Sequence, residues 1–144
     1  MRLPVMGVRC WAALVAALLV SGSGLVVASA AGPAPEGPFE VELVIRHSRF
    51  VPGTVKVPAG REVRFTVVNT DPIAHELIVG PRSVQDAHET GTDAVHGDVP
   101  GEVSVAPGGR ATTTYRPVVA EPILLGCHLP GHWDYGMQGQ LTPT

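Results

Sequence analysis

Three side chains that can bind a soft metal lie close together in the segment Gly126–Met137 (GCHLPGHWDYGM). Four residues separate Cys127 from His132, and four more separate His132 from Met137. A thiolate, an imidazole and a weak thioether suit copper, especially in a site that visits Cu(I), whereas zinc rarely binds methionine. The three ligand types in this one segment therefore predict a copper site.

One loop between two strands is expected to carry these three ligands. A run of residues that favours β structure ends at Cys127, and another begins at Met137. Pro130-Gly131 and Gly136 permit tight backbone bends between the two runs. The loop can therefore direct all three side chains toward one centre.

A trigonal site needs a second imidazole, and His75 is the best candidate for it. His75 begins a strand expected over 75–79, directly after the turn sequence Asn69–Pro72 (NTDP). A sandwich could bring this strand end beside the strand that leads into Cys127. The predicted metal ligands are therefore His75, Cys127, His132 and Met137.

The remaining histidines carry weaker expectations. His88 and His96 lie in the polar stretch 80–101 among several carboxylates, where a second metal could bind. A solvated loop is the favoured interpretation, because no fixed ligand spacing is evident. His47 is expected at the surface, and His128 is expected to face solvent or lie beside the site without binding the metal.

The hydrophobic pattern predicts an all-β fold. Apolar and polar residues alternate along most of the ordered-looking segments, and the 17 glycines and 14 prolines disfavour long helices. At most one helical turn is expected, near 83–88. The architecture expected from seven or eight short strands is an antiparallel β-sandwich. The strands are predicted at 39–46, 54–57, 62–69, 75–79, 102–105, 110–116, 123–127 and 137–142.

The N-terminus resembles an export signal. Arg2 and Arg9 precede the apolar run 11–20, and Ala28–Ala30 reads ASA, a small-x-small cleavage pattern. An uncleaved anchor is the alternative, but this run is shorter than the roughly 20 residues that span a bilayer. Residues 1–30 are therefore predicted to be a signal peptide, which places the mature protein in the periplasm or outside the cell.

The rest of the chain is expected to form one domain. Residues 31–38 (AGPAPEGP) form a Pro- and Gly-rich linker, and residues 39–144 form the folded domain. Cleavage leaves 8 Lys and Arg against 13 Asp and Glu, which argues against a nucleic-acid partner. It also leaves Cys127 as a single thiol, which is either a metal ligand or a buried inert group.

The C-terminal motif, with Pro-Gly before its histidine and a separate upstream histidine, resembles the cupredoxin (blue copper) family. The likeness is to single-domain plastocyanin- and azurin-like secreted bacterial proteins. The resemblance implies a Greek-key β-sandwich with one copper ion. It implies His75, Cys127 and His132 as equatorial ligands and Met137 as the axial ligand. Three upstream pieces also match, FVPGTVKVPAG (50–60), VRFTVVNTD (63–71) and AHELIVG (74–80).

Two departures from the family pattern matter for the site. Many members have Asn or Ser directly after the first histidine ligand, where this chain has Glu76, so the resemblance does not extend to that contact. His128 follows Cys127, as in multicopper oxidases, but Gly126 precedes the cysteine and the His-x-His pairs of those enzymes are missing. A trinuclear copper cluster is therefore not expected.

These observations predict a monomeric one-electron carrier that meets redox partners transiently. The alternative is a module that stores copper or delivers it to an acceptor through the same ligands. An enzyme would need a second copper centre with an open position, for which the sequence offers too few suitably placed histidines. No stable membrane insertion is expected after signal cleavage. A metal-free adhesion-type sandwich would leave Cys127 unexplained.

Overall fold

A computed structural model of the chain describes residues 37–91, 96–118 and 122–144. The described residues belong to one compact unit. The predicted signal peptide, and all but the last two residues of the predicted linker, lie outside the described residues. Over the described ranges, no helix has the length and apolar character required to cross a bilayer.

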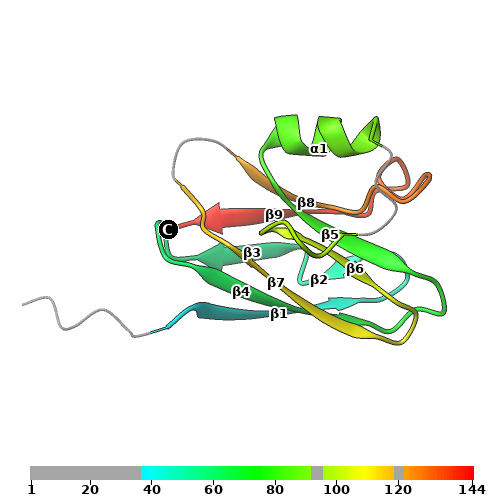
Figure 1. Cartoon of the computed structure of the whole chain (residues 1–144), viewed down its shortest axis with the longest axis horizontal. Helices are drawn as coiled ribbons and strands as arrows, with labels where there is room; N and C mark the ends of the chain where they lie inside the picture. The colour runs from blue at the N-terminus through cyan, green and yellow to red at the C-terminus, as the bar shows by residue number, and fades with distance from the viewer. Residues whose placement is uncertain (1–36, 92–95, 119–121) are drawn as a thin grey trace, which may run out of the picture. The chain divides into compact units, whose positions relative to one another are not determined.

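In the described part of the chain, nine strands form two sheets that face each other, with the core between them (Figure 1). The four-stranded sheet has the order β2 (Phe50–Val51), β1 (Phe39–Ile45), β4 (Val63–Asn69), β7 (Arg110–Tyr115). The five-stranded sheet has the order β3 (Thr54–Val57), β9 (Gln138–Pro143), β8 (Ile123–Gly126), β5 (His75–Gly80), β6 (Glu102–Val105).

Alternating apolar residues build the core from both sheets. In β4, Val63, Phe65 and Val67 are fully buried, whereas Arg64 between them is exposed. Such alternation is what a strand with one solvated face requires. The largest members of the shared core include Leu43, Ile45, Phe65, Leu77, Ile123, Leu125, Met137 and Leu141.

The predicted β-sandwich is confirmed, with two refinements. The two-residue strand β2 was not expected, because it is too short to show an alternating pattern. Two strand pairings, β1 with β4 and β3 with β9, are parallel, whereas the other pairings are antiparallel. Neighbours in both sheets are mostly not consecutive in sequence, as a Greek-key arrangement requires.

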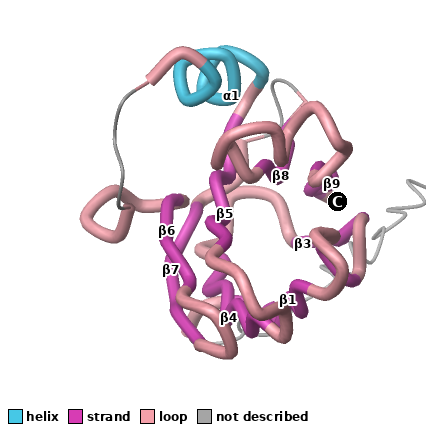
Figure 2. The backbone as a smooth tube through the Cα atoms, turned by 90° about the vertical axis from the view of Figure 1, so that its right-hand side faces the viewer, coloured by secondary structure: helices cyan, strands magenta, loops and turns pink. Residues whose placement is uncertain are grey.

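The helix α1 (Arg82–Glu89) is longer than the single turn expected from the sequence. It lies outside the five-stranded sheet, against β5 and β8 (Figures 1 and 2). Its inward side carries Val84, Gln85 and His88, so it has no apolar stripe by which a helix is recognised. Buried Gln85 instead donates its side-chain amide to backbone carbonyls of β5 and β8. Polar contacts therefore replace apolar packing beneath this helix.

The antiparallel pairing of β5 with β8 decides where the predicted ligands meet. Ile78 lies opposite Gly126, so the first residues of β5 lie beside the chain that leaves β8. His75 and Cys127 belong to the inner face of the sheet, where Cys127 joins the core. Successive strand residues point to opposite faces, so the next residue after each of them points outward.

Candidate metal centre

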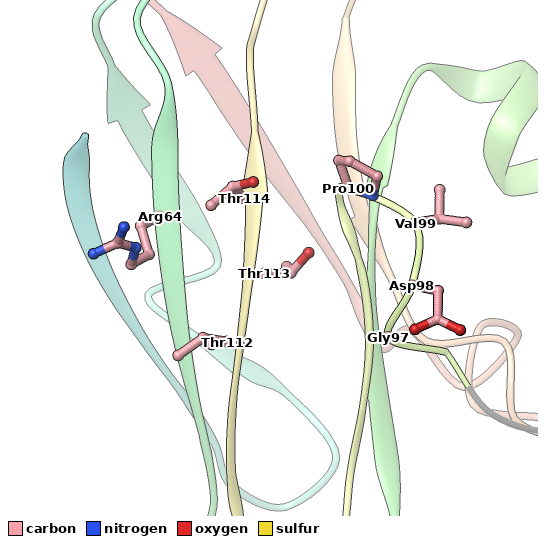
Figure 3. A pocket seen from close by; sticks show the side chains of 8 residues that line it. All are labelled: Arg64, Gly97, Asp98, Val99, Pro100, Thr112, Thr113 and Thr114. Carbon is pink, nitrogen blue, oxygen red and sulfur yellow. The ribbon is translucent and has the colours of Figure 1, made fainter. Parts of the chain in front are cut away.

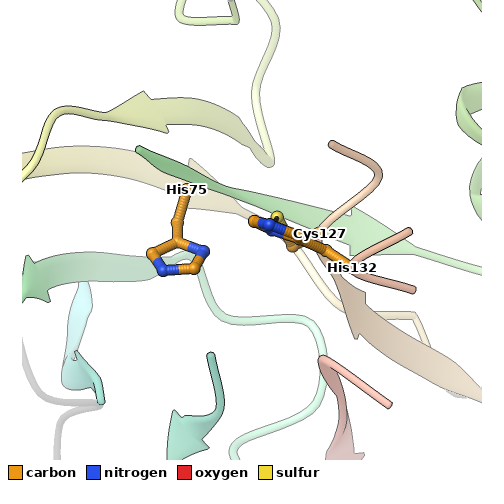
Figure 4. A group of neighbouring side chains, drawn as sticks. All are labelled: His75, Cys127 and His132. Atoms are coloured by element: carbon orange, nitrogen blue, oxygen red, sulfur yellow. Dashed lines mark hydrogen bonds between the residues drawn. The ribbon is translucent and has the colours of Figure 1, made fainter. Parts of the chain in front are cut away.

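Three of the four predicted ligands come together at one end of the sandwich. One ligand atom each of His75, Cys127 and His132 lies within 4.8 Å of the other two (Figure 4). The sulfur of Cys127 is 3.2 Å from Nδ1 of His132, and the two imidazole ring centres are 4.9 Å apart. A thiol and two imidazoles thus face one point in a buried site.

The tautomer of His75 is determined by its hydrogen-bond partner. Its Nε2 lies 3.0 Å from Oδ2 of Asp71, and a carboxylate can only accept, so Nε2 carries the proton and Nδ1 carries a lone pair. Among the described residues, His75 Nδ1 is the only buried side-chain nitrogen or oxygen without a partner. Burial lowers the pKa of His75, which favours the neutral ring. A buried, unpartnered imidazole nitrogen fits a metal ligand.

Asp71 is itself held firmly, so it can orient the ring of His75. Its carboxylate accepts backbone N–H groups of His47 and Ser48, each at 2.7 Å. Burial alone would raise the pKa of Asp71, but these two bonds and the His75 contact hold it below its usual value. The side chain of Asn69 accepts the backbone N–H of Asp71 at 2.9 Å. The predicted turn before His75 is therefore a support for the ligand.

Cys127 is fully buried. Burial raises the pKa of the thiol to about 11, although the backbone N–H groups of Glu76 and Leu129 act in the opposite direction. The group therefore remains a thiol at neutral pH unless a cation is bound beside it.

Tight turns bring His132 and Met137 to Cys127. Gly131 and Gly136 have φ of 80° and 84°, values that favour glycine. The backbone N–H of Met137 donates to the carbonyl of His132 at 2.9 Å, and that of Cys127 donates to the carbonyl of Met137 at 3.3 Å. Met137 is fully buried in the core beside Cys127. Its role as axial ligand stays a prediction.

Glu76 supplies the loop contact to which the family resemblance did not extend. Its carboxylate is buried, and Oε1 accepts the backbone N–H of His128 at 2.6 Å. This bond ties the strand that carries His75 to the loop that follows Cys127. A carboxylate therefore fixes the ligand loop of this chain.

His128 lies beside the site, which is the second of the two placements expected for it, and His47 is exposed as predicted. The side chain of His128 is 2% exposed and stacks on Trp133 with ring centres 4.7 Å apart. Its Nε2 lies 2.7 Å from Oε1 of Gln85, and its Nδ1 lies 2.7 Å from Oε2 of Glu89. His128 therefore braces α1 against the ligand loop, outside the group of three ligands.

The expectation that His88 and His96 belong to a solvated loop is wrong. Their side chains are 16% and 6% exposed, and together with Glu102 they form a second group of possible metal ligands. The spacing of the three residues gives no sign of this group. It forms only because α1 and β6 pack beside β5, a tertiary arrangement that the polar sequence of 80–101 does not reveal.

A pocket of about 260 Å³ lies elsewhere, between β7 and the segment 97–100 (Figure 3). Threonines 112–114 line one side, and Arg64 and Asp98 are its charged residues. It contains no histidine or cysteine and none of the predicted ligands. The pocket is therefore not a competing site for a soft metal.

Comparisons with known proteins agree with this geometry, although no protein-family model matches the chain. The chain is 34% identical over 98 residues to the copper-resistant cuproprotein CopI of Rubrivivax gelatinosus, a match that covers 65% of this chain and 59% of that protein. It is 28% identical over 134 residues to CopI of Pseudomonas aeruginosa, which covers 71% and 74%. The chain thus spans less than two thirds of the Rubrivivax protein.

Among solved structures, auracyanin B superimposes with a TM-score of 0.60 and 26% identity, over 77% of this chain and 93% of that chain. The fold, the Cys-x4-His-x4-Met loop and the likeness to auracyanin B and CopI agree, and the chain has a cupredoxin-like β-sandwich fold.

Proposed function

We propose that this chain is an exported type 1 copper protein that carries one electron at a time. Copper would bind to Nδ1 of His75, Sγ of Cys127 and Nδ1 of His132, with Met137 as the weak axial ligand. The single observation that carries the proposal is the buried, unpartnered Nδ1 of His75 beside the thiol of Cys127. A bound copper ion supplies reversible one-electron chemistry between Cu(I) and Cu(II) in such a ligand set.

The protein's part is to hold the ligands still while the charge changes. Asp71 orients the ring of His75, and the backbone N–H groups of Glu76 and Leu129 favour the thiolate form of Cys127. Glu76 fastens the loop after Cys127. Ligands held in this way can accept both oxidation states with little rearrangement, which favours rapid electron transfer.

The proposed exit for the electron is His132, which is only partly buried. Tyr135 follows His132 by three positions in the sequence, and its side chain is 78% exposed. Ile73 precedes His75 by two positions, and its side chain is 46% exposed. Such exposed apolar groups suit transient docking of a redox partner through a small interface. The proposed setting is the periplasm or the extracellular space, with a monomeric protein that turns over no substrate.

A second candidate function is storage or delivery of copper. The names of the CopI relatives refer to copper resistance, which favours copper handling as well as electron transfer. The same ligands would serve both functions. A carrier exchanges electrons while it keeps its copper, whereas a delivery protein hands the ion to an acceptor.

The first experiment is the visible and EPR spectrum of the copper-loaded protein. An intense thiolate-to-Cu(II) band is expected, and Cys127→Ser should abolish it. Copper should also raise the melting temperature of the wild-type protein, because the ion binds only the folded state. A copper-saturated protein without the band and without a change in melting temperature would contradict the proposal.

A single experiment can then distinguish electron transfer from copper delivery. The reduced copper protein is mixed with an oxidant in the presence of a Cu(I) chelator. Rapid oxidation with copper retained supports the carrier. Slow oxidation with fast transfer of copper to the chelator supports delivery.

A further inference from the structure

A second group of metal-ligating side chains lies on the outer face of the five-stranded sheet. His88 comes from the C-terminal end of α1, Glu102 is the first residue of β6, and His96 lies in the segment before β6. One ligand atom of each lies within 4.8 Å of the other two. The proposed copper site uses the inner face of the same sheet, so the two groups share no residue.

The orientation of His88 leaves a lone pair directed into this group. Its Nδ1 lies 2.8 Å from the carbonyl oxygen of Val84, which can only accept, so Nδ1 carries the proton of the neutral ring. The unprotonated Nε2 then faces Oε1 of Glu102 at 3.3 Å. Two atoms with lone pairs at this distance repel each other unless a proton or a metal ion lies between them.

The ring of His96 lies between two carboxylates, one beside each of its nitrogens. Its backbone is held by Ser104, which accepts the N–H of His96 at 2.9 Å and donates its own backbone N–H at 3.0 Å. Nε2 of His96 lies 3.4 Å from Oε2 of Glu76, and Nδ1 lies 3.0 Å from Oε2 of Glu102. A proton on Nε2 leaves Nδ1 free to bind a metal. Metal-binding histidines commonly direct their other N–H to a carboxylate or a carbonyl in this way.

The negative charges of the carboxylates around the group also favour a bound cation. Glu76 and Glu102 are 4% and 16% exposed, and their ion pairs among the described residues are with His88 and His96 alone. Buried carboxylates are stable only when their charge is compensated. A divalent ion would compensate them without protonating either ring. The partial exposure of His88 and Glu102 leaves a path for the ion to enter.

We propose that His88, His96 and Glu102 bind one divalent transition-metal ion, with Glu76 holding His96 in position. Two imidazoles and one carboxylate suit Zn²⁺ and Cu²⁺, and they leave a further coordination position for water. The proposal goes beyond the electron-carrier function and does not depend on it. The two sites would lie on opposite faces of the five-stranded sheet. His75 and Cys127 point to the inner face, whereas the next residues, Glu76 and His128, point to the outer face.

Zn²⁺ titration by calorimetry tests the proposal in the full chain. One equivalent of Zn²⁺ should bind with unchanged affinity in Cys127→Ser, because that substitution leaves the second group intact. In His88→Ala and in Glu102→Gln, binding of this equivalent should be lost, or its affinity should fall by at least about tenfold. His47→Asn is the matched control, since His47 is exposed and lies outside both groups.

A second experiment uses Cu²⁺ in place of Zn²⁺. In addition to the signal of the thiolate-bound copper, EPR of the protein with excess Cu²⁺ should show a second copper signal with nitrogen hyperfine structure, and this second signal should disappear in His88→Ala. Competition between Zn²⁺ and Cu²⁺ then determines which ion the site prefers. Loss of this signal with the thiolate band retained separates the second site from the proposed carrier function.

Two results would overturn the proposal. One is equal Zn²⁺ stoichiometry and affinity in the wild-type protein, Glu102→Gln and His47→Asn. The other is a metal equivalent that disappears in Cys127→Ser and persists in His88→Ala. In either case the group is a cluster of ion pairs between protonated histidines and carboxylates. Circular dichroism of each variant checks the fold, and the nearly isosteric Glu102→Gln carries the test if His88→Ala does not fold.

Discussion

The carboxylate of Glu76 accepts the backbone N–H of His128 at 2.6 Å, although the two residues are 52 positions apart in the sequence. Each of them directly follows a proposed copper ligand, His75 in one case and Cys127 in the other. The bond therefore fastens together the two segments whose approach creates the site. It lies on the outer side of the sheet, and the ligands lie on the inner side.

Replacing Glu76 should loosen this connection. Glu76→Ala leaves the N–H of His128 without its partner, and an unsatisfied buried donor costs about 1–3 kcal/mol. Urea unfolding of the metal-free protein should show a loss of this size. Glu76→Gln keeps a carbonyl oxygen for the bond and should lose less stability. Equal losses in the two variants would show that the charge, and not the hydrogen bond, is what matters.

Asp71 should control copper affinity through the ring of His75. Asp71→Asn removes the negative charge that holds the proton on Nε2, so the lone pair on Nδ1 is no longer ensured. Loss of such an outer partner commonly weakens metal binding by roughly 10- to 100-fold. Competition with a copper chelator measures the change. Glu40→Gln, which removes an exposed carboxylate of β1, should leave the affinity unaltered.

The buried thiol of Cys127 should make the metal-free protein sensitive to alkali. Its pKa is raised from 9.0 to about 11 in the folded state, so unfolded chains lose this proton first as the pH rises. The stabilising contribution of the neutral thiol is fully present below pH 9 and is lost by about pH 11, with a magnitude of about 3 kcal/mol. Unfolding free energies measured across this range should fall more steeply for the wild-type protein than for Cys127→Ala. Parallel pH profiles would contradict the assigned cause.

Gly126 should resist any side chain, because α1 and the ligand loop close over it. A Cβ atom there would collide with Oε1 of Gln85 and would lie 2.8 Å from both Nε2 of His128 and the ring of Trp133. Gly126→Ala is expected to cost about 1–3 kcal/mol of unfolding free energy, as overpacked sites commonly do. Gly97→Ala is the control, since nothing lies within 4 Å of a Cβ at that position. Equal urea midpoints for the two variants would contradict this account.

Part of the fold and of the site could be predicted from the sequence because the relevant signals are local. Alternation along β1 and β4 marks half-buried strands, and turn residues mark their ends. Cys127, His132 and Met137 share one loop, so their spacing carries the chemistry of the ligand set without any knowledge of the fold.

The remaining features depend on tertiary structure, because they join segments that the sequence keeps apart. The antiparallel pairing of β5 with β8 brings His75 to Cys127, and the packing of α1 and β6 on β5 brings His88 to Glu102. The sequence predicted only one turn of α1, because Gln85 and His88 hold this helix by polar contacts and the segment therefore has no helical pattern of apolar residues. Local patterns determine strands and loops, whereas long-range pairing decides which side chains meet on either face of the sheet.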